Sequence, residues 1–365
     1  MFLKWGYRLI LKPIFFHFDP ETVHDQMISI GSVLGKFEVG KLIVRRLFWY
    51  QHPSLQQNVL GITFQNPIGL AAGFDKDANL TQILPEVGFG FEEIGSITGE
   101  KCVGNDRPRL WRAPNSKSLV VHYGLKSEGA LAIAAKLQKL NFKIPIGISV
   151  AKTNNIQTVE EKAGIADYVK AFKAFTSLGD YYTINISCPN TFGGQPFTHP
   201  IKLDHLLTEI DQIKTKKPIL VKFSPDLKRS HVDAVIRICL KHRIHGVILS
   251  NLTKNRHNSA VKDPYLPSYG GMSGKVVENL SNSLIKYVYK KYGKKLIIVG
   301  CGGVFSADDA YKKIKLGATL IQMITGMIYE GPQVIGDINR GLVKLLKKDG
   351  FSHISEAIGI DAKRK

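Results

Sequence analysis

The segment Asn185-Ile186-Ser187-Cys188-Pro189-Asn190 has the residue types that point most directly to chemistry. It places a thiol between two carboxamides, and Gly193 and Gly194 follow as a stretch able to move as a lid. A thiol suits proton transfer because its reference pKa is about 8.5 and a nearby lysine lowers it. Isolated cysteines are more often buried apolar side chains, but this one precedes Pro-Asn at the end of an apolar run. We therefore predict that Cys188 is an acid/base residue.

Lys222 lies inside the apolar run Pro218–Ser224, where a lysine is costly to bury without an anionic partner. A flavin would supply that partner, because its N1–C2 edge becomes negative when the ring is reduced. The alternative is an inward lysine paired with a structural carboxylate. Lys76, in the loop segment Gly73-Phe74-Asp75-Lys76, is less informative alone because a loop lysine usually faces water.

Two glycine-containing loops near the end of the chain predict a phosphate site. Val299-Gly300-Cys301-Gly302-Gly303-Val304 precedes a helical pattern, and Thr325-Gly326-Met327 ends the last apolar run. Glycines let backbone N–H groups approach a phosphate, and barrels commonly bind phosphate after their seventh and eighth strands.

Eight short apolar runs alternate with amphipathic helical patterns from about residue 67 onward. They are Pro67–Ala71, Glu92–Ile97, Ile144–Val150, Tyr181–Ser187, Pro218–Ser224, Gly246–Asn251, Leu296–Cys301 and Leu320–Thr325. Such runs are typical of parallel strands covered on both faces, and eight strand–helix units predict an α/β fold, a closed (β/α)8 TIM barrel. A doubly wound open sheet is the alternative, but it does not explain why polar residues follow the ends of the runs.

The composition is that of a globular protein with a basic surface. Fifty basic and 30 acidic residues give a formal charge of +20, which favours anionic membranes, polyanions or anionic substrates without choosing among them. The four cysteines are widely spaced, so we expect a reducing compartment and no metal site.

The first 50 residues form a separate, helical part of the sequence. One helix is predicted to begin at Asp19-Pro20-Glu21, an N-cap followed by proline. The stretch Tyr7–Phe18 is too short and too interrupted to span a membrane. Aromatic and basic residues are mixed here, so this part is either an interfacial membrane-binding layer or a cap packed on the barrel. We divide the chain into this extension (1–50), a barrel (51–350) and a basic C-terminal tail (351–365).

The motifs GLAAGFDK, EIGS, NDRPRLWR, NISCPNT, VKFSPDL, SNLT, GGMSG, VGCGG and QMITGMIYEGP occur in the order found in the dihydroorotate dehydrogenases. The chain resembles that family over almost its whole length, and FDPETVH with its helical extension resembles the quinone-dependent, membrane-associated class. The resemblance implies an FMN enzyme that oxidises dihydroorotate to orotate in pyrimidine biosynthesis. It implies quinone as acceptor and peripheral binding to the cytoplasmic side of the cell membrane, with no nucleic acid partner.

Site residues follow from the same resemblance. The implied FMN contacts are Ala72, Gly73, Lys76, Ser96, Ser149, Asn185, Lys222, Ser250, Gly274, Gly303, Ile324 and Thr325. The implied substrate contacts are Lys76, Tyr123, Gly124, Leu125, Asn185, Asn190 and Asn251. Cys188 would remove a proton from C5 while hydride passes from C6 to flavin N5, and Arg112 would line the quinone tunnel.

Four positions depart from the family pattern. Cys188 is the choice of the soluble class, whereas the quinone-dependent class usually has serine. Val121 replaces a substrate-binding asparagine, Leu252 replaces a threonine, and Ser149 replaces an FMN-contacting asparagine. These changes leave the subclass and the substrate open.

Three alternatives remain at this point. A soluble-class dehydrogenase would pass electrons to fumarate instead of quinone. A tRNA dihydrouridine synthase is also an FMN barrel with an Asn-x-x-Cys-Pro loop, but that family typically carries an RNA-binding helical domain after the barrel. A non-enzymatic basic barrel that binds nucleic acid is the third.

Overall fold

Eight parallel strands close into a barrel in the computed structural model, which describes residues 2–363. In chain order they are β3 (Ile68–Leu70), β4 (Phe91–Ile97), β7 (Ile146–Val150), β8 (Tyr181–Asn185), β9 (Ile219–Phe223), β10 (Gly246–Leu249), β12 (Ile297–Cys301) and β13 (Leu320–Met323). Each strand pairs with its neighbour in sequence, and β13 pairs with β3 to close the ring. All eight predicted runs are therefore strands, and the predicted barrel is confirmed.

Strand register places the polar residues at one end of the barrel. The strand interiors are buried on both sides, as their continuous apolar character predicts. Asn185 at the end of β8 is the register partner of Lys222 in β9, so these side chains lie at the same level. The loops that follow the strands gather at this carboxyl end, where barrel enzymes build their sites.

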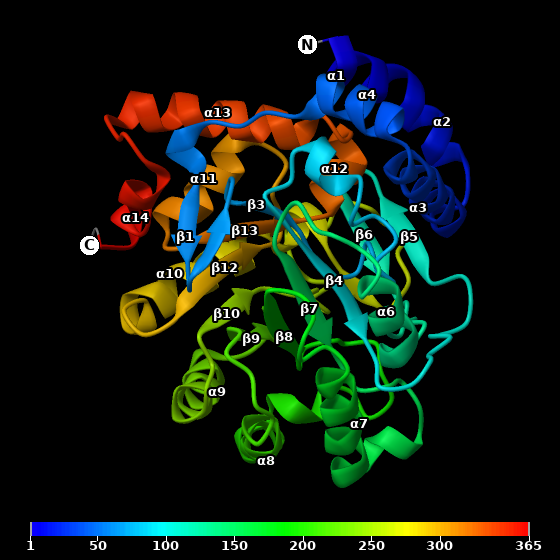
Figure 1. The fold of residues 1–365 in the computed structure, drawn as a ribbon, viewed down its shortest axis with the longest axis vertical. Coiled ribbons are helices and arrows are strands. Elements are labelled where there is room, and N and C mark those ends of the chain that lie inside the picture. The colour runs from blue at the N-terminus through cyan, green and yellow to red at the C-terminus, as the bar shows by residue number, and fades with distance from the viewer. Residues whose placement is uncertain (1, 364–365) are drawn as a thin grey trace.

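Helices surround the barrel between the strands (Figure 1). They are α5 (Leu84–Val87), α6 (Ala130–Leu137), α7 (Glu161–Lys173), α8 (Pro200–Asp211), α9 (Arg229–Lys241), α10 (Glu278–Tyr292), α11 (Ala307–Lys315), α12 (Thr325–Glu330) and α13 (Val334–Asp349). Ser306 caps α11 by accepting a hydrogen bond from the N–H of Asp309, the role for which serine is favoured at a helix start.

Two small sheets were not predicted. The hairpin of β1 (Gln57–Val59) and β2 (Ile62–Phe64) packs Phe64 edge-on against Phe91, a residue of the barrel. A second sheet joins β5 (Leu110–Ala113), β6 (Ser118–Val121) and the short β11 (Gly271–Met272).

The N-terminal helices gather beside β5 and α12 (Figure 1). They are α1 (Phe2–Gly6), a π-helical turn (Tyr7–Leu11), α2 (Lys12–His17), α3 (Pro20–Lys36) and α4 (Glu38–Phe48). Asp19 caps α3 by accepting from the N–H of Thr22, at the predicted start. Among residues 2–363, no helix is both long and apolar enough to cross a membrane.

The segment predicted as a basic C-terminal tail packs on the barrel instead. A 3-10 turn at Ile354–Ala357 and the helix α14 (Ile360–Lys363) bury Ile354, Ala357 and Ala362. Burial of these apolar side chains removes the reason to separate residues 351–363 from the barrel, while residues 364 and 365 lie outside the described part.

Candidate active site

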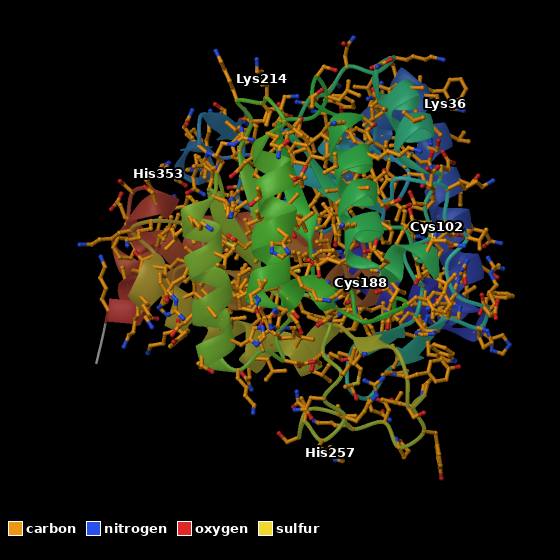
Figure 2. The ribbon with its side chains drawn as sticks, turned by 90° about the horizontal axis from the view of Figure 1, so that it is seen from below. Lys36, Cys102, Cys188, Lys214, His257 and His353 are labelled. Carbon is orange, nitrogen blue, oxygen red and sulfur yellow. The ribbon has the colours of Figure 1, made fainter. Side chains whose placement is uncertain are left out.

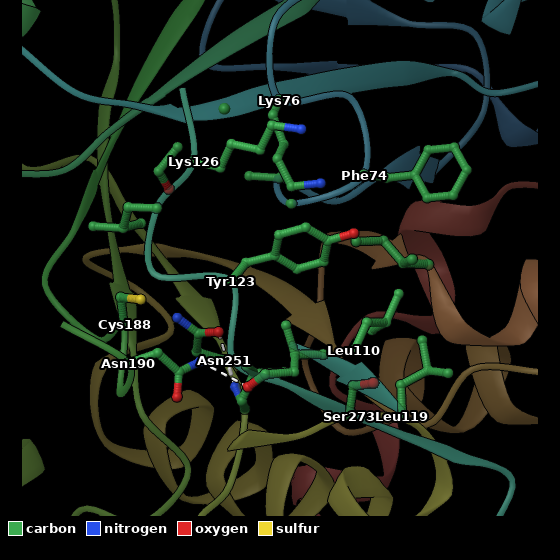
Figure 3. Close-up of a pocket in the computed structure, with 18 of the residues that line it drawn as sticks. Phe74, Lys76, Leu110, Leu119, Tyr123, Lys126, Cys188, Asn190, Asn251 and Ser273 are labelled. Atoms are coloured by element: carbon green, nitrogen blue, oxygen red, sulfur yellow. Dashed lines mark hydrogen bonds between the residues drawn. The ribbon is translucent and has the colours of Figure 1, made fainter. Parts of the chain in front are cut away.

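Three cavities with shared walls lie at the carboxyl end of the barrel. The central cavity adjoins a glycine-lined cavity through Ala72, Lys222 and Thr325. It adjoins an apolar cavity under the N-terminal helices through His24 and Phe74. Figure 3 shows side chains that line the central cavity, among them Cys188, Asn190, Tyr123 and Lys76.

The glycine-lined cavity has the features of a phosphate cradle. Its wall includes Ser250, Gly274, Gly303, Ile324 and Thr325, all implied as cofactor contacts. Gly302 and Gly303 have positive φ angles of 110° and 77°, and their N–H groups donate to no acceptor within residues 2–363. Unpaired N–H groups beside a helix start are suited to bind a phosphate.

Lys222 is 4% exposed and lines both polar cavities. It makes no ion pair or hydrogen bond with any other described residue, so the alternative of a structural carboxylate partner is wrong. A buried ammonium without a protein partner favours an anionic ligand at this position.

Hydrogen bonds fix the carboxamides of the central cavity. Asn185 donates to Ser96 Oγ (2.8 Å), and its oxygen accepts from Nδ2 of Asn251 (3.3 Å). Asn190 donates to the carbonyl oxygen of Val121 (2.8 Å), while its own buried Oδ1 has no partner. That unpaired acceptor is available to an N–H of a ligand.

Cys188 is half-buried and lines the central cavity. Figure 2 labels it near the middle of the view, between the peripheral Lys214 and His257. Burial raises the pKa of its thiol to about 11, although the nearby Lys152 acts in the opposite direction. We expected a lysine to lower this pKa; desolvation instead outweighs that attraction. The thiol is therefore protonated at neutral pH in this structure.

The loop after Cys188 is held in place by residues from the end of β7. Lys152 donates to the carbonyl oxygen of Phe192 (3.0 Å), and Asn154 Oδ1 accepts from the Phe192 N–H (2.8 Å). Gly193 and Gly194 have φ angles of 71° and 68°. Opening this loop as a lid thus requires breaking at least these two hydrogen bonds.

Lys76 also lines the central cavity. Its Nζ donates to Nε2 of His24 (3.2 Å) and lies 3.9 Å from the centroid of the Tyr123 ring. Burial lowers the pKa of Lys76 to about 8, and the charge of Lys126 lowers it further.

The apolar cavity, which we call the tunnel below, has a volume of about 270 Å³ and lies between the N-terminal helices and the barrel. Its lining includes Met27, Ile30 and Leu34 of α3 together with Arg112 of β5. Arg112 donates to the carbonyl oxygen of Phe18 (2.7 Å) and lies over the Phe16 ring at 4.6 Å.

The structure brings together nearly all predicted site residues. Ala72, Gly73, Gly124, Leu125 and Asn251 line the central cavity with those described above. Ser149 is the exception: it is fully buried behind the wall, where its hydroxyl forms a 2.8 Å hydrogen bond with that of Ser96. The Ser149 side chain, which is shorter than the asparagine of the family pattern, therefore positions Ser96 and does not reach the cavity. From the sequence we assigned no role to His24, which ends the motif FDPETVH, or to Lys126, which follows the implied contacts at residues 123–125.

The departures Val121 and Leu252 both line the central cavity, so the substitutions alter its wall directly. Val121 still contributes a backbone oxygen to Asn190, as noted above. Its side chain and that of Leu252 replace two polar groups by apolar ones.

A closed barrel with polar cavities at the carboxyl ends of its strands has the architecture of the barrel enzymes. Residues 54–346 match the family model described as dihydroorotate dehydrogenase. A curated relative from Trichodesmium erythraeum, named dihydroorotate dehydrogenase (quinone), is 36% identical over 97% of this chain and 98% of its own. A relative of the same name from Sulfurovum sp. is 38% identical over 97% and 98%.

The fold is also similar to a crystal structure of dihydroorotate dehydrogenase from Eimeria tenella in complex with ferulenol. The TM-score is 0.84 at 26% identity, over 95% of this chain and 96% of that one. The chain therefore belongs to the dihydroorotate dehydrogenase family, whose members are flavin-dependent oxidoreductases.

Proposed function

We propose that this protein oxidises dihydroorotate to orotate in pyrimidine biosynthesis and passes the electrons through FMN to a quinone. The observation that carries the proposal is the continuity of three cavities: a phosphate cradle, a polar cavity with a thiol, and an apolar tunnel. Relatives named for quinone and similar over nearly their whole length support the choice of acceptor.

The residues present fit FMN. The free N–H groups of Gly302 and Gly303 would hold its phosphate, and the unpaired Lys222 would face the ring edge that becomes anionic on reduction. A Cβ on Gly73 would meet only Ile324 Cδ1, at 3.9 Å, so this wall leaves room for a ring. Bound FMN would accept a hydride from the substrate and later release the electrons to the quinone.

The chain's own residues would bind, orient and deprotonate the substrate. The carboxylate of dihydroorotate would lie against the Lys76 ammonium, and Asn190 Oδ1 would accept from a ring N–H. Cys188 would take the proton from C5 as its thiolate. The hydrogen bonds on Phe192 would keep the following loop closed and exclude water.

The N-terminal helices would place the tunnel entrance at a membrane surface. Most of the large exposed apolar side chains of the described residues belong to them, including Leu9, Ile10, Val39 and Leu42 at 61–68% exposure. Arg45 and Arg46 are exposed on α4 beside them. Apolar contact combined with screened attraction to anionic lipids supports peripheral binding at the cytoplasmic face.

One experiment tests the core of the proposal. Purified protein should release FMN, and not FAD, on denaturation, and the bound flavin should bleach when dihydroorotate is added without oxygen. Stopped-flow reoxidation then compares a long-chain quinone with fumarate. Fast reoxidation by fumarate alone would favour the soluble-class acceptor, which Cys188 suggests, while absence of flavin bleaching would reject the substrate.

A further inference from the structure

Lys126 is a cation of the central cavity that the proposed function leaves without a role. The cavity wall contains three lysines, Lys76, Lys126 and Lys222, and no aspartate or glutamate of the described residues. Lys222 is assigned to the cofactor and Lys76 to the substrate carboxylate. Lys126 is half-buried, and within residues 2–363 it forms neither an ion pair nor a hydrogen bond.

The backbone around Lys126 is fixed. On one side, the N–H of His122 donates to the carbonyl oxygen of Arg109 (2.8 Å). On the other, Ser127 and Cys102 exchange two backbone hydrogen bonds of 2.8 and 2.9 Å. The segment that carries Tyr123 and Lys126 is therefore anchored at both ends, and the position of Lys126 at the cavity is part of the fold.

The side chains of Lys126 and Lys76 lie in the same region of the central cavity. Figure 3 draws both side chains on one side of the Tyr123 ring. Their charges are close enough for Lys126 to lower the pKa of Lys76, and both lower that of His24. Two cations near each other in a partly dry cavity repel, and an anion bound near both removes that cost.

We propose that Lys126 is a specificity-determining residue that joins Lys76 in a two-cation site for the carboxylate of the dihydropyrimidine. The proposal rests on the proposed function, since it names how the substrate's anionic group is recognised. Lys126 acts on binding, and the chemical step at Cys188 does not depend on it.

Lys126→Gln tests this role, with Lys139→Gln as the matched control. Lys139 is an exposed lysine beyond the end of α6, so its variant makes the same change in net charge away from the cavity. For Lys126→Gln we expect the Kd of orotate, followed by the absorbance of oxidised bound flavin, to rise roughly tenfold, about 1.4 kcal/mol. KM for dihydroorotate should rise by a similar factor while kcat is unchanged. The affinity for orotate should also become less sensitive to salt.

A neutral analogue separates carboxylate recognition from general damage. The affinity of dihydrouracil, which lacks the carboxylate, should be the same in wild type and Lys126→Gln. An unchanged Kd for orotate, or an equal loss for dihydrouracil, would overturn the assignment of Lys126. If wild type binds orotate but dihydroorotate does not bleach its flavin, the proposed function is wrong. The comparison of orotate affinity between wild type and Lys126→Gln still tests the role of Lys126 in that case.

Discussion

The Nζ of Lys76 donates a 3.2 Å hydrogen bond to Nε2 of His24, which links the barrel loop after β3 to helix α3. Burial and the nearby lysine charges lower the pKa of His24 to about 2, so its ring is neutral and accepts this bond. The contact lies where the central cavity meets the tunnel, because His24 lines both. The proposed carboxylate site and the proposed quinone path therefore share one wall.

The pKa of Lys76 predicts how orotate binding depends on pH. With a pKa of about 8 in the free protein, Lys76 is cationic below pH 8 and neutral above it. Because an anion binds the cationic form, orotate affinity should be constant below pH 8 and fall about tenfold per pH unit above it. Lys76→Arg, which stays charged, should remove this dependence in a titration of the bound flavin. A wild-type affinity that is flat from pH 7 to 10 would contradict the depressed pKa.

Cys188→Ala should fold and keep flavin but lose reduction by dihydroorotate by about 10²- to 10⁴-fold, the usual effect of removing a general base. Cys188→Ser should retain some activity with its pH optimum moved upward, because a hydroxyl is less acidic than a thiol. Single-turnover flavin bleaching measures both variants. Undiminished bleaching in the alanine variant would show that Cys188 is not the base.

The same thiol shapes the pH profile of the wild-type enzyme. The active form needs the Cys188 thiolate, with a pKa of about 11, and the Lys76 ammonium, with a pKa of about 8. The amount of active enzyme is the fraction of Cys188 present as thiolate multiplied by the fraction of Lys76 present as ammonium. This product predicts that kcat/KM for flavin reduction rises about tenfold per pH unit below 8 and is level between about 8 and 11. A profile that is level from pH 6 would mean that the bound substrate or cofactor lowers the thiol pKa.

Arg112→Met should weaken only the reoxidation of the reduced flavin by quinone. Arg112 lies in the tunnel wall and away from the central cavity, so flavin bleaching by dihydroorotate should be unchanged. We expect KM for a long-chain quinone to rise roughly tenfold, since a hydrogen bond from a charged donor is lost. Arg237→Met, at an exposed position of α9 outside the extension, is the control. Equal quinone kinetics in the two variants would remove Arg112 from the quinone path.

Membrane binding can be tested on the exposed face of α4. Leu42 and Ile43 are 63% and 55% exposed, and each would contribute about 1.5–3 kcal/mol if fully buried in lipid. Leu42→Glu with Ile43→Glu should reduce partition onto anionic vesicles by more than tenfold, and salt should weaken wild-type binding. The control pairs Val103→Glu with Leu131→Glu, at sites 75% and 67% exposed outside the extension. A similar loss in both double variants would argue for a charge effect and against this docking face.

Sequence patterns sufficed for the barrel because each strand is a short apolar run between helical patterns, and Asp19 and Ser306 begin helices where their cap signals stand. The hairpin β1–β2 was missed because each of its three-residue strands has an exposed central residue and so forms no continuous apolar run, whereas the equally short β3 is buried throughout. Lys126 was missed because nothing local distinguishes a lysine facing a cavity from one facing water. The pKa of Cys188 could not be predicted, since it depends on how fully distant segments bury the thiol.

Glu21 of α3 forms a buried ion pair with Arg109, which directly precedes β5, through bonds from Nε and Nη2 of 2.8 to 3.1 Å. Separating such a pair leaves an uncompensated charge in the interior, which costs about 3–5 kcal/mol. The helical extension is therefore no interchangeable module. A truncated chain that starts after Phe48 would leave the Arg109 guanidinium without the carboxylate of Glu21. A fusion protein in which another membrane anchor replaces this extension would need its own carboxylate at the position of Glu21.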